Sequence, residues 1–160
     1  MNPPSLLDAI RVVKRNEEKA RDSYAKAMTT IKNQAGRHLF EQLKEFEHYH
    51  FEKLTELEKS LEETGGFIDY KGREFPLPPV FVIKAAKDLG GKTIMKIVVE
   101  AMELEQEAKD TYANLSEQIS DPQGQKMFSR LSDEEYNHYR ILKEAYWTLS
   151  NLGVWKWSRL

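Results

Sequence analysis

The sequence contains no cysteine, which excludes disulfide bonds and metal sites built from thiolates within this chain. It also has no apolar run near the roughly 18 residues that a membrane-spanning helix requires. The formal net charge is only −2, so the chain has no general attraction to nucleic acid or to an anionic membrane. We therefore expect no nucleic-acid partner and no membrane association.

The first residues, MNPPSLLDAI, lack a basic segment followed by a long apolar one. They predict no signal peptide, and we expect a cytoplasmic protein. With 160 residues, the chain has the size of one domain, and a chain of this size buries roughly two thirds of its unfolded surface without needing disulfides. We expect a single domain over residues 1–160.

Four segments have the periodicity and the end signals of long helices. They run from about Leu6 to Ile31, Ala35 to Glu63, Thr93 to Ile119 and Asp121 to Ser150. Ser5 with Asp8 resembles a capping box at the start of the first helix, Gly65 is a stop signal for the second, and Asp121 before Pro122 is a cap for the fourth. Short connections make antiparallel neighbours, so the sequence predicts two helical hairpins, residues 6–63 and 93–150, followed by a tail at 151–160.

The connection between the hairpins, residues 64–92, is rich in glycine, proline and aromatic residues. A connection of this length crosses the domain or has a function of its own. Its apolar residues, such as Phe75, Leu77 and Phe81, predict that it packs on the bundle or on a partner chain, and a short helix is one possibility for Val80 to Asp88. Four helices with one long crossover between the second and the third predict an all-α four-helix bundle.

The two predicted hairpins are copies of one another at an offset of 88 residues. The segment EEKARDSYAKA, which starts at Glu17, matches EQEAKDTYANL, which starts at Glu105. The segment that starts at Ala35 matches the segment that starts at Gln123 in the same way. Features that occur in one hairpin are therefore expected at the equivalent place in the other.

Each predicted helix has a stripe of apolar residues at spacings of four and three, which is typical of a bundle core. In the middle of each helix this stripe is interrupted by ionisable residues, which are Glu17, Glu47, His50, Glu105, Glu135 and His138. An isolated buried charge costs on the order of tens of kcal/mol by a Born estimate, and the stripes offer no cation to pair with these carboxylates. Two divalent metal ions would neutralise the four carboxylates with both histidines neutral. Carboxylate and imidazole ligands without thiolate suit iron or manganese and also accept zinc.

One Glu from each of two helices plus Glu-x-x-His from each of the other two resembles the ligand set of ferritin-like di-iron carboxylate proteins. The segment from Glu17 to Tyr24 and the segment LKEFEHYH around Glu47 are similar to the erythrin domain of rubrerythrins, and so is the Tyr that follows each lone Glu by seven residues. The resemblance covers the whole chain. It implies the ferritin-like fold and a cofactor of two iron ions per chain, oxo- or hydroxo-bridged when oxidised, with manganese or zinc as possible substitutes and no haem.

The resemblance also implies a role for each residue of the site. Glu47 and Glu135 would bridge the two metals. Glu17 with His50 would complete one metal position, and Glu105 with His138 the other. Tyr24 and Tyr112 would hydrogen-bond to the ligand carboxylates and fix their orientation, although both could instead be plain core aromatics.

The chain departs from rubrerythrins in two ways. The rubredoxin module is absent, and so is the extra Glu about one turn from Glu105, where Met102 and Ala108 stand instead. The ligand set is therefore symmetric and resembles the ferroxidase site of bacterioferritin as much as that of rubrerythrin. We expect an oxidoreductase that reduces hydrogen peroxide or O₂ with an external electron donor. The alternatives are a ferroxidase of an iron-storage protein and a non-catalytic helical module stabilised by metal.

Partners follow from the same comparison. Because the chain has no cysteine, a rubredoxin-like electron donor would have to be a separate protein, and the crossover favours a homodimer over a cage.

Two further sequence patterns have simpler interpretations. Glu45 and His48 also read Glu-x-x-His but lie off the apolar stripe, so we expect them on the surface. The three tryptophans near the end of the chain are expected to cover one end of the bundle or to form a dimer contact.

Overall fold

The computed structural model describes residues 3–79 and 91–158 of the chain, with side chains from Leu6 onward. Within these ranges the structure has four long helices and no strand, which confirms the predicted all-α four-helix bundle. The helices are α1 (Pro3–Thr30), α2 (Gln34–Glu63), α4 (Gly91–Gln118) and α5 (Pro122–Leu152).

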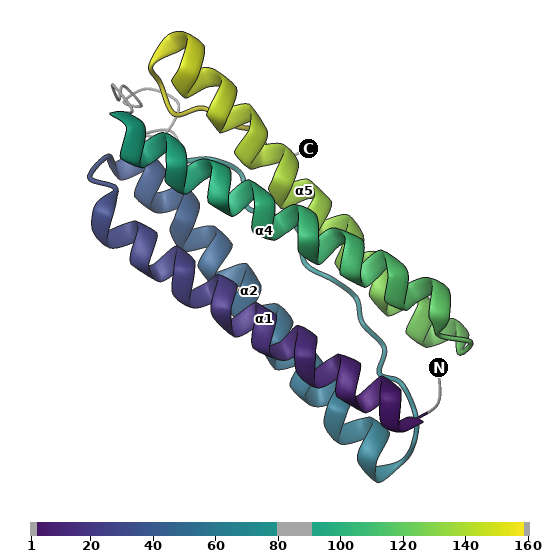
Figure 1. Cartoon of the computed structure of the whole chain (residues 1–160). Coiled ribbons are helices and arrows are strands. Elements are labelled where there is room, and N and C mark those ends of the chain that lie inside the picture. The colour runs from purple at the N-terminus through teal and green to yellow at the C-terminus, as the bar shows by residue number, and fades with distance from the viewer. Residues whose placement is uncertain (1–2, 80–90, 159–160) are drawn as a thin grey trace.

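The helices form two antiparallel hairpins that lie side by side (Figure 1). The turn between α1 and α2 lies at one end of the molecule, and the turn between α4 and α5 lies at the opposite end. The described part of the crossover, residues 64–79, is irregular and runs along the bundle from the end of α2. The two hairpins are thus related as the repeat in the sequence predicts, with α1 and α4 as equivalent helices.

The helix ends follow the sequence signals, with one correction. Asp121 accepts hydrogen bonds from the N–H groups at the start of α5, and Gly65 has a φ of 76° just beyond α2. The prediction that Ser5 begins the first helix was wrong, because α1 already begins at Pro3. A proline fits the first turn of a helix, where its fixed φ is suitable and its missing N–H would have no partner in any case.

The core consists of two apolar clusters, one toward each end of the bundle. In α1, the first cluster takes Tyr24 and Ala27, together with Ile31 just beyond the helix, and the second takes Ile10 and Val13. The other three helices divide in the same way, with Phe46, Ala101 and Ile141 in the first cluster and Leu54, Leu115 and Leu131 in the second. The ionisable residues lie between the two clusters along each helix, so the fold contains a polar layer at mid-length.

Equivalent contacts close the two ends of the bundle. Asn33 caps α2 by accepting from the N–H groups of residues 35 and 36, and Asp121, 88 residues later, caps α5 in the same way. Next to each cap, a glycine is covered by an aromatic ring from the segment that directly follows the other hairpin. Phe67 lies on Gly124, and Trp155, again 88 residues later, lies on Gly36.

Substituting Gly36 by alanine is expected to destabilise the protein by about 1–3 kcal/mol, the usual cost of overpacking a core. The added Cβ would lie 2.6 Å from Trp155 Cζ2 and 2.8 Å from Ile31 Cγ2, and a buried indole ring cannot move aside at low cost. Thermal unfolding followed by circular dichroism measures the effect. Gly66→Ala is the control, because its Cβ would meet only Thr64 Oγ1 at 3.4 Å. Equal melting temperatures for the two variants would contradict this packing.

The crossover packs on the bundle, as expected. Phe75 is buried and stacks on Phe46 of α2 with ring centroids 6.0 Å apart, whereas Leu77 is exposed. The possible helix over Val80 to Asp88 lies outside the described residues. Of the three tryptophans, Trp155 and Trp157 are buried in the first cluster and cover an end of the bundle, while Trp147 is exposed.

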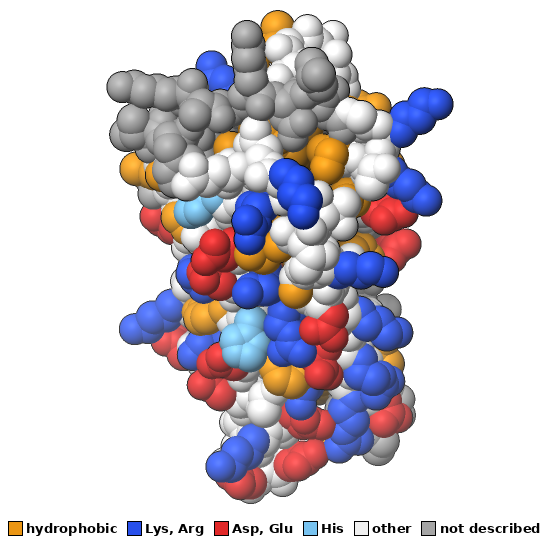
Figure 2. Space-filling view, turned by 90° about the vertical axis from the view of Figure 1, so that its left-hand side faces the viewer, with side chains coloured by type: hydrophobic (Ala, Val, Ile, Leu, Met, Phe, Trp, Pro, Cys, Tyr) orange, Lys and Arg blue, Asp and Glu red, His pale blue; other side chains and the backbone are white. Residues whose placement is uncertain are grey.

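The described surface carries mixed charge. On the face shown in Figure 2, acidic and basic side chains are interspersed, without a large area of one sign. Among the described residues, no helix is long and apolar enough to cross a bilayer.

Candidate metal centre

The six ionisable residues singled out in the sequence converge at the middle of the bundle. Each of the four helices contributes its Glu or its Glu-x-x-His pair, and none of the six side chains is more than 3% exposed. They are Glu17 from α1, Glu47 and His50 from α2, Glu105 from α4, and Glu135 and His138 from α5. The interruption of each apolar stripe therefore marks one common polar layer.

Within this layer the ligand-type atoms form two overlapping groups that could each hold a metal ion. One group contains Glu17 and His50, and the other contains Glu105 and His138. Both groups contain Glu47 and Glu135, and the atoms of each group lie within 4.8 Å of one another. Glu47 and Glu135, which the resemblance to di-iron proteins predicts as bridging residues, are thus the two residues that both groups share.

The histidines direct the same ring nitrogen into the layer. His50 Nδ1 lies 3.1 Å from Glu135 Oε1 and 3.6 Å from Glu17 Oε1. His138 Nδ1 lies 3.2 Å from Glu47 Oε1 and 3.4 Å from Glu105 Oε2. In both groups an imidazole nitrogen and carboxylate oxygens thus surround one point.

The unpartnered atoms in this layer fit a bound metal. Glu17 Oε2, Glu47 Oε2, Glu105 Oε2, Glu135 Oε1 and His50 Nδ1 are fully buried and lack a hydrogen-bond partner within the described structure. Buried polar atoms are almost always satisfied, so five such atoms at one place need another partner. Oxygen and imidazole donors of this kind can hold a divalent transition metal.

Without metal, the layer must hold protons. Burial raises the pKa of Glu135 well above its ordinary value, and the neighbouring Glu105 and Glu47 raise it further. Burial alone would lower the pKa of His138, but the nearby Glu105 and Glu47 outweigh it and raise the pKa to about 9. The pKa of His50 is raised as well, because Glu17 and Glu135 outweigh the effect of its burial. Protons therefore supply part of the positive charge that metal ions would otherwise bring.

Two buried tyrosines hydrogen-bond to carboxylates across the layer. Tyr24 on α1 donates to Glu105 Oε1 on α4 at 2.7 Å, and Tyr112 on α4 donates to Glu17 on α1. These are the interactions expected for both tyrosines. Each bond links the equivalent helices of the two hairpins and fixes one carboxylate oxygen.

Glu134 is a buried residue of the site that the sequence reasoning missed. It is 5% exposed, and its Oε1 lies 3.0 Å from His50 Nε2, on the side of the ring away from the polar layer. Its carboxylate also accepts from the hydroxyl of Tyr70 and from the N–H of Arg73, both in the crossover. The sequence contained one indication of this residue, a mismatch between the two copies of the repeat. Glu134 corresponds to Phe46, 88 residues earlier.

The second Glu-x-x-His pattern lies on the surface, as predicted. Glu45 and His48 are both exposed, and His48 Nε2 lies 2.7 Å from the exposed Glu52. The same motif in the same helix thus has two different environments, and the apolar stripe distinguishes them.

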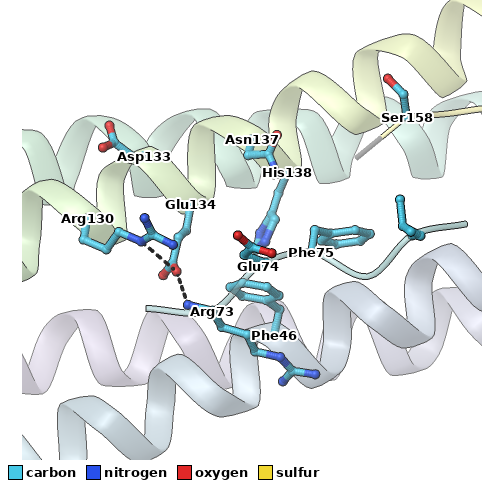
Figure 3. A pocket seen from close by; sticks show the side chains of 11 residues that line it. Phe46, Arg73, Glu74, Phe75, Arg130, Asp133, Glu134, Asn137, His138 and Ser158 are labelled. Carbon is cyan, nitrogen blue, oxygen red and sulfur yellow. Dashed lines mark hydrogen bonds and ion pairs between the residues drawn. The ribbon is translucent and has the colours of Figure 1, made fainter. Parts of the chain in front are cut away.

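Two cavities reach the layer from different sides. One, of about 290 Å³, lies between α1 and α4, and its lining includes Glu17 and Glu105 together with Ala20 and Ala108. The other, of about 550 Å³, lies over α5 and the crossover and is lined by Phe46 and His138 (Figure 3). Of these two cavities, the one between α1 and α4 is lined by the four carboxylates of the layer, Glu17, Glu47, Glu105 and Glu135.

Comparison with known proteins identifies the family of the chain and a protein of similar fold. The family model described as Rubrerythrin matches residues 6–146. A hypothetical protein from Pyrococcus furiosus has a similar fold, with a TM-score of 0.72 over 94% of this chain and 93% of that chain at 23% sequence identity. No curated protein matches the sequence. Because the family model covers most of the chain, the chain belongs to the rubrerythrin family.

Proposed function

We propose that the chain is a non-haem di-iron protein that holds two iron ions on Glu17, Glu47, His50, Glu105, Glu135 and His138. The observation that carries this proposal is the pair of overlapping groups that share Glu47 and Glu135. Four carboxylates balance two divalent ions with both histidines neutral. Membership of the rubrerythrin family favours iron over manganese or zinc.

We further propose that the protein is an oxidoreductase that reduces hydrogen peroxide or O₂ with an external electron donor. Bound iron would supply the electrons by changing between the ferrous and the ferric state. The chain supplies a water-poor layer, carboxylates oriented by Tyr24 and Tyr112, and a small cavity that admits an oxidant. Without cysteine, the chain has no thiolate centre, so a rubredoxin-like donor would be a separate protein.

Stopped-flow oxidation of the anaerobic ferrous protein tests the proposed activity. Mixing with hydrogen peroxide or with O₂ should oxidise the bound iron faster than free ferrous ion at the same pH. Comparison of the two oxidants identifies the substrate. Oxidation of the bound iron no faster than that of free iron, by either oxidant, would contradict the proposed activity.

Substituting Ala108 by leucine is expected to slow this oxidation severalfold while the iron content stays unchanged. Ala108 lines the cavity between α1 and α4, and a leucine side chain would fill space next to the carboxylates without removing any of them. Ala113→Leu on the same helix, outside that cavity, is the matched control. If the bound iron of Ala108→Leu and of Ala113→Leu is oxidised at the wild-type rate, the oxidant does not enter between α1 and α4.

The symmetric set of carboxylates favours one alternative, a ferroxidase that feeds a store of iron. Met102 and Ala108 lie about one turn from Glu105, where the resemblance to rubrerythrins would imply an additional Glu. Storage requires a hollow cage, whereas we propose a homodimer. Size-exclusion chromatography with light scattering distinguishes the two assemblies by their molar mass. The mass of a dimer would exclude a cage.

A further inference from the structure

The two metal positions have different surroundings on the outer side of their histidines. The repeat relates Glu17 to Glu105, Tyr24 to Tyr112 and His50 to His138, each by 88 residues. By the same offset Glu134 corresponds to Phe46. The residue directly before each shared carboxylate is thus a carboxylate in one hairpin and a phenyl ring in the other.

At His50 the outer ring nitrogen has a firmly held partner. Glu134 Oε1 lies 3.0 Å from His50 Nε2. Glu134 is itself held by the Tyr70 hydroxyl and, through Oε2, by the Arg73 N–H at 2.6 Å. A carboxylate on the outer nitrogen keeps the proton there, so the lone pair of Nδ1 faces the metal position, and it makes the imidazole a stronger ligand.

At His138 the equivalent partner is absent among the described residues. His138 Nε2 is buried without a hydrogen-bond partner. The Phe46 ring lies edge-on to the His138 ring with centroids 4.3 Å apart, and Phe75 lies on another side at 5.5 Å. Figure 3 shows these rings beside His138, with Glu134 one turn away on the same helix. Packing holds this imidazole in place, but within the described part of the chain no acceptor binds its outer nitrogen, fixes its tautomer or strengthens it as a ligand.

We propose that the two metal positions are unequal, and that the position completed by His50 binds its ion first and more tightly than the position completed by His138. This inference rests on the proposed two-metal function. Carboxylate partners of a metal-bound histidine change metal affinity by about 10- to 100-fold. We therefore expect two binding steps whose dissociation constants differ by about that factor.

Calorimetric titration of the metal-free full-length protein with Mn²⁺ tests this inequality, with the electron paramagnetic resonance signal of free Mn²⁺ as a second measurement. Two steps of unequal affinity are expected for the wild type. Two equal steps would overturn the inequality and leave the two-metal site intact. Binding of fewer than two ions would contradict the proposed function itself, so the two failures are distinguishable.

Variants identify which position is the tight one. His138→Ala should abolish the weak step and keep the tight one, and His50→Ala should do the reverse; the opposite pattern would overturn the assignment. Glu134→Gln keeps the shape but removes the charge at His50, and should weaken the tight step about 10-fold or more. Asp133→Asn removes the same charge from an exposed neighbour and should change neither step. If Asp133→Asn and Glu134→Gln act alike, the contact with His50 is not the cause.

The reciprocal variant, Phe46→Glu, places a carboxylate beside His138 and should tighten the weak step toward the tight one. Phe46→Leu keeps an apolar residue there and should leave the two steps unequal. Circular dichroism confirms that each variant is folded before titration. If Phe46→Glu is folded and its weak step is unchanged, the missing carboxylate does not explain the difference between the positions.

Discussion

Glu135→Ala is expected to abolish paired metal binding and leave at most one ion per chain. Glu135 is shared by both groups, so its removal takes a ligand from each position and leaves three carboxylates for two divalent ions. Loss of a residue that only supports a ligand already costs about 10- to 100-fold in affinity, and loss of a shared ligand should cost more. Elemental analysis after metal loading and dialysis measures the stoichiometry.

Glu45→Ala is the control for this variant. Glu45 also begins a Glu-x-x-His pattern and lies only two residues from Glu47, but it is exposed. It should therefore retain the wild-type metal content. Glu47→Ala should behave as Glu135→Ala does, because Glu47 is also shared by both groups. Two ions per chain in either Glu47→Ala or Glu135→Ala would show that the assigned residues are not the bridging ligands.

The metal-free protein is expected to lose stability as the pH rises from 6.5 to about 9, and metal is expected to restore it. His138 has a raised pKa of about 9 in the folded protein, against an ordinary value of 6.5. Its contribution to the free energy of unfolding is therefore fully present below pH 6.5 and is lost as the pH rises through 9. The raised pKa values of Glu17, Glu105 and Glu135 act in the same direction.

Bound metal replaces these protons, so its stabilising effect should grow over the same pH range. One ion at a thousand times its dissociation constant adds about 4 kcal/mol. For a chain of this length each kcal/mol raises the melting temperature by about 2–4 °C, which gives a rise of roughly 8–16 °C for a single ion. Calorimetric melts with Mn²⁺ and with chelator, at both ends of the pH range, measure the difference. A metal-free melting temperature that rises over this range would contradict the protonated layer.

The sequence predicted the bundle and the six residues because both depend on periodicity. Leu, Ile and Val recur at helical spacing in all four helices, and a charge on such a stripe must be buried wherever the helix is packed. Glu17 and Glu47 could therefore be assigned to one layer before any contact was known. The repeat gave independent support, since the same interruption occurs in both hairpins.

Glu134 could not be found in this way because its role depends on contacts outside the stripe. It lies one position away from Glu135 on α5, and two of its partners, Tyr70 and Arg73, belong to the irregular crossover. No periodicity places a residue of an irregular segment. The packing of Trp155 on Gly36 was hidden for the same reason, because it joins a tail to a distant helix start.

The central claim is a pair of iron ions on six buried residues, and the most direct measurement is the iron content of the protein together with its Mössbauer spectrum. Protein produced with ample iron and oxidised in air should contain two irons per chain. The spectrum should be that of two ferric ions coupled to one another. One iron or fewer per chain, or two irons without magnetic coupling, would contradict the account, and metal-free protein after iron-replete expression would favour a purely structural helical module.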